Sequence, residues 1–126
     1  MSTSSAIRDI GPRFFEAQDR LRGGPDRDLC APDYRIEIAG NPPLDYAGHE
    51  QFAKAFYSAF PDLSHRIEDV VAEGDRVVVR FALCGTHTGN FMGIPPTGRE
   101  VAVPMALFCG IEAGKIRRGE LRRLFE

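Results

Sequence analysis

Apolar residues recur at helical spacing in the first part of the chain, at Ile7, Ile10, Phe14, Ala17 and Leu21. We therefore expect a first helix, capped by Ser4 or Ser5. The Gly11-Pro12 pair inside this pattern predicts either a kink or a later start, because proline lacks a backbone N–H. A second helical pattern covers residues 48–60, and the proline directly after it predicts where that helix ends.

The remaining pattern is the alternation that is typical of strands. One short strand alternates between two faces, with Tyr34, Ile36 and Ile38 on one and Arg35 and Glu37 on the other. Two long hairpins follow, at residues 63–85 with a turn at 73–75 and at residues 99–125 with a turn at 112–115. Helices first and strands afterwards indicate an α+β fold. We expect the helices to pack in a strongly curved, mainly antiparallel sheet, which forms a cone with an apolar interior suited to a small molecule.

Length, charge and cysteine content narrow the class of protein. The 126 residues fit one domain, and the net charge of −2 offers no basic surface for nucleic acid. No apolar run reaches the ~18 residues of a membrane span, and the N-terminus lacks the order of a secretory signal, so we expect a cytoplasmic protein. The chain has three cysteines, an odd number, and they are widely spaced at Cys30, Cys84 and Cys109. This pattern predicts free thiols rather than disulfides or a zinc site.

The most distinctive stretch is GTHTGNFMGIPPTGREV, residues 85–101. Together with FPDLSHRIEDVVAEGDRVVVRF before it, the later GKI and the order of the helices, it resembles the SnoaL-like polyketide cyclase group. This group lies within the nuclear transport factor 2-like, or ketosteroid-isomerase-like, superfamily, and the resemblance spans about residues 5 to 125. It implies the cone fold, a hydrophobic small-molecule ligand and a homodimer. It does not fix the reaction, because one such cone hosts enzymes of several kinds and plain binders.

The resemblance weakens on the last strand. The family usually reads GKI-V-E-H-W followed by an aspartate that acts as general acid and base, and here the matching run is GKIRRGELRRLF. Gly119 stands where histidine is common, and Leu121 stands where the resemblance places the aspartate. Met105 and Leu107 occupy positions of the preceding strand that often carry polar groups. Two hypotheses therefore stay open: an enzyme that transfers protons, and a non-catalytic binding protein that keeps the cone.

Three residues are candidates for acid–base chemistry. The resemblance assigns Glu37 to a cavity-facing position, where burial would make it a usable base; the alternative is a solvated carboxylate next to Arg35. His65 shares a strand face with apolar residues and is either a catalytic group or a satisfied core residue. His87, in the motif, is either catalytic or a brace for a Gly- and Pro-rich turn whose apolar residues fold over the cone.

The expected pocket is lined by large apolar and aromatic side chains: Phe14, Tyr34, Phe56, Tyr57, Phe81, Met105, Leu107 and Leu121. The tyrosines are also candidate hydrogen-bond donors to a substrate carbonyl. No metal-binding triad, phosphate loop or nucleophile motif is present, so we expect no metal and no cofactor. A run of arginines at residues 117–123 predicts a solvated face or a subunit interface. A protein–protein module, which would dimerise through the outer face of the sheet, is a third hypothesis.

Overall fold

The computed structural model describes residues 7–91 and 93–124. In chain order the elements are α2 (Ile10–Leu21), a short 3₁₀ helix η1 (Arg27–Leu29), β1 (Cys30–Ile38), α3 (Tyr46–Ala59), β2 (Ser64–Glu73), β3 (Arg76–Thr86), β4 (Glu100–Glu112) and β5 (Lys115–Arg123). Both predicted hairpins are confirmed. β1 begins four residues earlier than the alternation alone predicts, at Cys30.

The two helices begin where local chemistry allows. α2 starts at Ile10, which confirms a later start, and Pro12 then falls in the first turn, where no intrahelical N–H bond is lost. The predicted caps Ser4 and Ser5 lie outside the described residues. α3 begins earlier than predicted because the carboxylate of Asp45 accepts a hydrogen bond from the backbone N–H of Gly48 at 2.8 Å.

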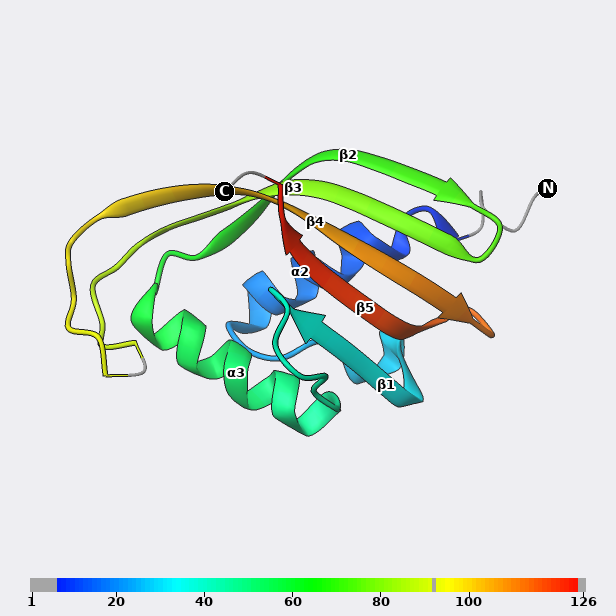
Figure 1. The fold of residues 1–126 in the computed structure, drawn as a ribbon, viewed down its shortest axis with the longest axis horizontal. Helices are drawn as coiled ribbons and strands as arrows, with labels where there is room; N and C mark the ends of the chain where they lie inside the picture. The colour runs from blue at the N-terminus through cyan, green and yellow to red at the C-terminus, as the bar shows by residue number, and fades with distance from the viewer. Residues whose placement is uncertain (1–6, 92, 125–126) are drawn as a thin grey trace.

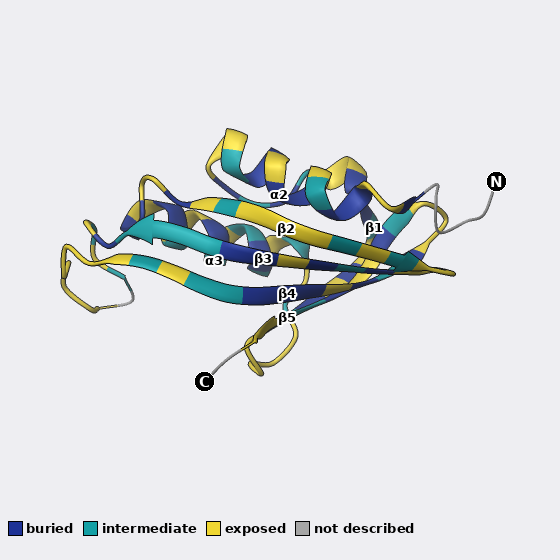
Figure 2. Ribbon diagram, turned by 90° about the horizontal axis from the view of Figure 1, so that it is seen from above, coloured by how far each residue is buried: buried dark blue, intermediate teal, exposed yellow. Residues whose placement is uncertain are grey.

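The five strands form one sheet in the order β1-β5-β4-β3-β2 (Figure 1). β1 pairs in parallel with β5, and the other three pairings are antiparallel. β1 and β2 are the two edges, so the sheet curves without closing. Figure 2 shows both helices on the same side of the sheet, with buried segments in β3 and β4, whereas β2 is exposed or intermediate along its length. The expected α+β cone is therefore confirmed.

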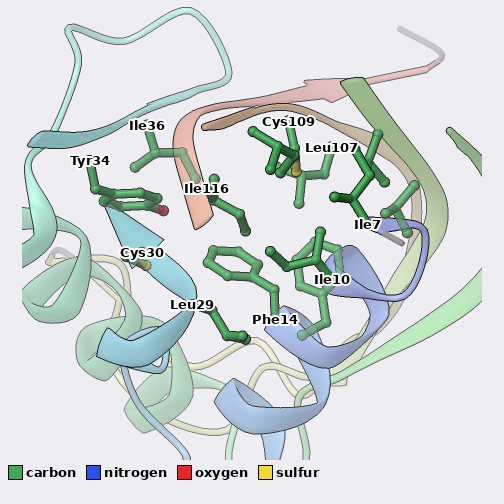
Figure 3. Close-up of a cluster of buried hydrophobic side chains, with 14 of the residues drawn as sticks. Ile7, Ile10, Phe14, Leu29, Cys30, Tyr34, Ile36, Leu107, Cys109 and Ile116 are labelled. Atoms are coloured by element: carbon green, nitrogen blue, oxygen red, sulfur yellow. The ribbon is translucent and has the colours of Figure 1, made fainter. Parts of the chain in front are cut away.

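The core lies between the helices and the inner face of the sheet. It includes the large side chains of Phe14 and Phe15 from α2, Tyr34 from β1, and Phe81 and Leu107 from the sheet, each at most 2% exposed. Figure 3 shows Tyr34 reaching inward from β1 and Phe14 reaching inward from α2. The interior of the cone is thus occupied by the protein's own aromatic side chains.

Gly119, where the sequence departs from the pattern of the group it resembles, is closely packed against the core. Gly119 pairs with Ile36 across β1 and β5, and a Cβ atom at position 119 would lie 3.3 Å from the Ile36 side chain. Leu107 is the next neighbour, at 3.6 Å. Because Ile36 occupies the space above Gly119, a larger side chain there would require this part of the core to repack.

Two further expectations can be compared with the fold. None of the helices among the described residues has the length and apolar character that a membrane crossing requires. Cys30, Cys84 and Cys109 are free thiols, as predicted. Cys30 and Cys109 are buried, and burial raises the pKa of each to about 12, so both stay protonated at neutral pH.

Candidate active site

The described residues hold a compact polar network where α2, α3 and the start of β2 meet. The carboxylate of Asp19 accepts three hydrogen bonds there. The Tyr57 hydroxyl donates at 2.5 Å, the backbone N–H of His65 donates at 2.9 Å, and Nδ1 of His65 lies 2.8 Å from the same carboxylate. The side chains of His65 and Asp19 are 9% and 23% exposed, so the network lies at the rim of the interior.

Helical spacing explains why these groups meet. Phe15 and Asp19 are one turn apart on α2 and therefore share a face. The ring of Phe15 stacks on the ring of His65 with centroids 4.3 Å apart, while Asp19 bonds the same histidine. Arg22, at the end of α2, lies over the Tyr57 ring at 4.8 Å and donates to the backbone oxygen of Leu63 at 2.7 Å. The His65 ring is therefore held by the stacked Phe15 ring on its face and by Asp19 at Nδ1.

The charge state of Asp19 fixes the tautomer of His65. Partial burial acts to raise the pKa of Asp19, but hydrogen bonds from His65 and Tyr57 outweigh it, and the pKa lies below its ordinary value. An ionised carboxylate only accepts hydrogen bonds, so Nδ1 of His65 carries a proton. When the ring is neutral, Nε2 is then the basic nitrogen. Burial and the hydrogen bond to Asp19 raise the pKa of Tyr57, which stays protonated.

A second polar pair lies deeper in the interior. The Tyr34 hydroxyl and Nδ1 of His49 are 2.9 Å apart, and the two residues are 1% and 3% exposed. Burial, with a smaller contribution from the nearby charge of His65, lowers the pKa of His49 to about 4. Burial likewise raises the pKa of Tyr34 well above its ordinary value. Both groups are therefore neutral at physiological pH.

The third histidine has a different environment. His87 stacks on Phe60 with ring centroids 5.0 Å apart, and its Nδ1 lies 3.1 Å from the Thr97 hydroxyl. Its backbone also bonds Gly98 and Arg99 across the loop. Among the described residues, Nε2 of His87 is the one buried side-chain nitrogen or oxygen without a partner. This geometry matches the brace interpretation of His87 more closely than the catalytic one.

Burial distinguishes His65 from the other two histidines. The His65 side chain is 9% exposed, whereas His49 and His87 belong to the buried polar residues. Among the described residues, the side-chain hydrogen bonds of His49 and His65 are made through Nδ1.

Strand alternation places Glu37 away from this interior. Its neighbour Ile36 is fully buried on the inner face with Tyr34, and Glu37 is half-buried with its side chain on the opposite face. It pairs with Glu120, which in turn pairs with the exposed Phe108. The expected cavity-facing position of Glu37 does not follow from this register, because a residue next to an inward residue on a strand must point outward.

The residues that the sequence analysis assigned to a pocket lie mostly in the packed core on the inner side of the sheet. Phe14, Tyr34, Phe81, Met105 and Leu107 belong to the buried core, and Leu121 packs against it. Phe56 and Tyr57 lie on α3 in a second cluster. Two surface clefts, of about 490 and 360 Å³, are lined by other residues, at 8–12 with 67–70 and at 31–33 with 112–117.

Asp19 and His49 are functional candidates that the sequence analysis missed. Asp19 stands among charged residues in EAQDRL, which is typical of a solvated helix face. His49 precedes Phe52 and Ala53 by three and four positions, so helical spacing alone placed it on the buried face of α3. No group of three His, Cys, Asp or Glu side chains within the described ranges is arranged to hold a metal ion.

Comparison with known proteins places the chain in a family. The sequence model of the SnoaL-like polyketide cyclase family matches residues 23–120. The chain belongs to this family. No curated protein sequence matches significantly.

Solved structures of SnoaL-like proteins have the same fold. One, from Jannaschia sp. CCS1 and named a SnoaL-like polyketide cyclase, is 26% identical with a TM-score of 0.82, and the match covers 96% of this chain and 88% of that one. IdmH from Streptomyces antibioticus, named a polyketide cyclase, is 29% identical with a TM-score of 0.76, covering 90% and 88%. AclR from Streptomyces galilaeus, named a hydroxylase, is 24% identical with a TM-score of 0.81, covering 96% and 90%, and its likeness concerns the fold alone.

Proposed function

We propose that this SnoaL-like protein is a cofactor-independent enzyme that transfers protons on a hydrophobic, carbonyl-bearing and polyketide-like small molecule. The reaction class is an aldol-type cyclisation, an isomerisation or a dehydration, each of which begins with loss of a proton next to a carbonyl. The observation that carries the proposal is the hydrogen-bonded pair of Asp19 and His65 at the rim of an apolar interior.

The pair provides a general base. Nε2 of His65 removes the proton from the carbon next to the carbonyl, and the electron pair of the broken C–H bond forms the enolate. The resulting imidazolium is stabilised by the Asp19 carboxylate 2.8 Å from Nδ1. Tyr57 and the His65 backbone N–H hold that carboxylate in place. His65 then returns its proton to the product.

The second candidate function is a non-catalytic binding protein, and one observation favours it. The inner face of β4 and β5 carries Leu107 opposite Leu121 and Cys109 opposite Gly119, so it offers apolar contacts where the family places acid–base groups. A protein with this inner face can bind an apolar ligand without transforming it. The two functions differ in whether His65 exchanges a proton with the bound molecule.

An exchange experiment separates them. Deuterium incorporation next to the carbonyl of 1-tetralone, followed by proton NMR in D2O, reports enolisation without knowledge of the natural substrate. We expect the wild-type protein to accelerate exchange and Asp19→Asn to lose ~100- to 10,000-fold of that acceleration, because an asparagine N–H would donate to Nδ1 and leave the proton on Nε2.

Glu37→Gln is the matched control, since it removes a carboxylate from the outer face and should change exchange less than twofold. Exchange that depends on Glu37 and not on Asp19 would refute the assignment of the base. Tight binding of 1-tetralone with no acceleration of exchange would support the binding protein instead.

We further propose that the outer face of the sheet forms a homodimer. Phe108 is 44% exposed there, and charges of both signs surround it, with Arg118 and Glu120 on β5 and Arg35 and Glu37 on β1. Two copies of such a face can pair an apolar centre and a rim of complementary charges. Light scattering should give the mass of a dimer for the wild type and that of a monomer for Phe108→Asp. A monomeric wild type would contradict the proposal.

A further inference from the structure

Tyr57 and His65 donate to the same oxygen atom of Asp19. The Tyr57 hydroxyl lies 2.5 Å from Oδ1, and Nδ1 of His65 lies 2.8 Å from the same atom. The other carboxylate oxygen, Oδ2, accepts the backbone N–H of His65 at 2.9 Å. Two donors on one oxygen each withdraw electron density from it, so each bond is weaker than it would be alone. Tyr57 and the His65 ring therefore compete for Oδ1.

This competition bears on the strength of the base. When Nε2 of His65 takes up a proton, the positive charge of the ring is stabilised by the electron density that remains on Oδ1 of Asp19. A strong bond from Tyr57 lowers that density, and with it the basicity of Nε2. Against partial burial, the bonds from His65 and Tyr57 also hold the pKa of Asp19 below its ordinary value. The carboxylate therefore leaves the Nδ1 proton on the ring.

Arg22 strengthens Tyr57 as a donor. Its guanidinium lies over the Tyr57 ring, 4.8 Å from the centroid, where a positive charge draws electron density from the phenol. Burial and the bond to Asp19 raise the pKa of Tyr57, and the charge of Arg22 acts against that rise. Arg22 reaches this place from a left-handed backbone with a φ of 56°, which is uncommon for a residue other than glycine. Nη1 also donates to the backbone oxygen of Leu63 at 2.7 Å, so the guanidinium is fixed between Tyr57 and the start of β2.

A second arginine–tyrosine pair on α3 provides a comparison. Arg27 lies over the Tyr46 ring, 4.5 Å from the centroid, and the Tyr46 hydroxyl donates to the backbone oxygen of Pro25 at 2.7 Å. Tyr46 therefore has the same kind of cation on its ring, but its acceptor is a neutral carbonyl. Tyr57 differs in that its acceptor is the carboxylate of the proposed catalytic pair.

We propose that Tyr57 is a positioning residue that shares Oδ1 of Asp19 with His65 and so limits the basicity of Nε2, and that Arg22 sets how strongly it does so. This inference rests on the proposed function, because it concerns the residue that removes the proton. Tyr57 and Arg22 act through Asp19, and both keep their protons throughout. The result is a milder base, which stays in the neutral form that can accept a proton.

The Nδ1 proton of His65 tests the shared oxygen directly. Its chemical shift, observed by NMR of protein labelled with ¹⁵N-histidine, moves downfield as the bond to Oδ1 strengthens. We expect Tyr57→Phe, which keeps the ring, to move this resonance downfield, because Oδ1 then has one donor fewer. Arg22→Gln removes the charge, keeps an N–H group, and should move the resonance in the same direction by a smaller amount. Tyr46→Phe is the matched control and should leave it unchanged.

The direction of the shift separates this role from a purely structural one. If Tyr57 only held Asp19 in place, its loss would loosen the bond between Asp19 and His65 and move the resonance upfield. An upfield shift in Tyr57→Phe, or no shift, would overturn the proposal, as would an equal shift in Tyr46→Phe. An upfield shift in Arg22→Gln would overturn the part assigned to Arg22.

Deuterium exchange into 1-tetralone tests the consequence for the base. At pH 9, where an imidazole is neutral, we expect Tyr57→Phe to exchange at least twofold faster than the wild type, because a stronger base removes the proton faster. Failure of the proposed function is distinguishable. If the resonance moves downfield but no variant accelerates exchange, the shared oxygen is supported and enolisation by His65 is wrong. If the wild type accelerates exchange and Tyr57→Phe is no faster, the base remains and the limit on its basicity is wrong.

Discussion

Acid sensitivity of the fold should be traceable to His49. Burial lowers its pKa from an ordinary value of 6.5 to about 4. Between these two pH values the unfolded chain binds a proton that the folded chain does not, so acid favours unfolding. Each tenfold change in proton affinity is worth about 1.4 kcal/mol, which gives a loss of about 3 kcal/mol of unfolding free energy as pH falls from 6.5 to 4. Above pH 6.5 this contribution is fully present.

Urea unfolding followed by circular dichroism over a pH series measures this loss. His49→Gln is the matched variant, since it cannot titrate, and its unfolding free energy should fall by about 3 kcal/mol less than that of the wild type between pH 6.5 and 4. Asp19 and Asp62, whose pKa values lie below the ordinary 3.8, lose their stabilising contributions at lower pH and in both proteins. Parallel pH curves for wild type and variant would refute the argument that His49 is buried and neutral.

Two pairs of substitutions test the packing. Leu107→Ala should lower the unfolding free energy measured in urea by ~2–5 kcal/mol, because Leu107 is 1% exposed. Phe108→Ala, at the neighbouring position, should lower it by under ~1 kcal/mol in a monomeric background. Equal losses would contradict the assignment of inner and outer faces. Gly89→Ala would place a Cβ atom 2.6 Å from the Ser58 backbone oxygen and should cost ~1–3 kcal/mol, while Gly110→Ala, with its nearest contact at 3.8 Å, should cost nothing. A Gly89→Ala protein as stable as the wild type would show that the loop at 87–99 is not packed against α3.

The sequence predicted the fold well because the fold depends on regular patterns. Both hairpins turn where glycine allows a positive φ, at Gly74 with 60° and Gly114 with 77°. The two helices follow their apolar spacing, and their ends moved by a few residues because Pro12 and Asp45 act locally. The parallel pairing of β1 with β5 left no mark on the sequence pattern, since alternation shows a strand's faces and not its neighbours.

The site was harder to predict because its geometry depends on neighbours. His65 was a candidate from the sequence, but its hydrogen-bond partner Asp19 comes from another element and is surrounded by charged residues in the sequence. Glu37 was assigned to the interior by resemblance, although the alternation around Ile36 already indicated the outer face. His49 had a readable helical position, but a histidine at such spacing is ordinarily a satisfied core residue.

The position of β5 has a consequence for how the chain folds during synthesis. Of the described strands, β5 is made last, and it joins β1 to the rest of the sheet, with Ile36 beside Gly119 and Arg35 beside Arg118. Until β5 leaves the ribosome, β1 and β4 each expose an unpaired backbone edge, and the interior is open on the side of Tyr34. Pairings between such distant segments form slowly, so the nascent protein should depend on chaperones late rather than early.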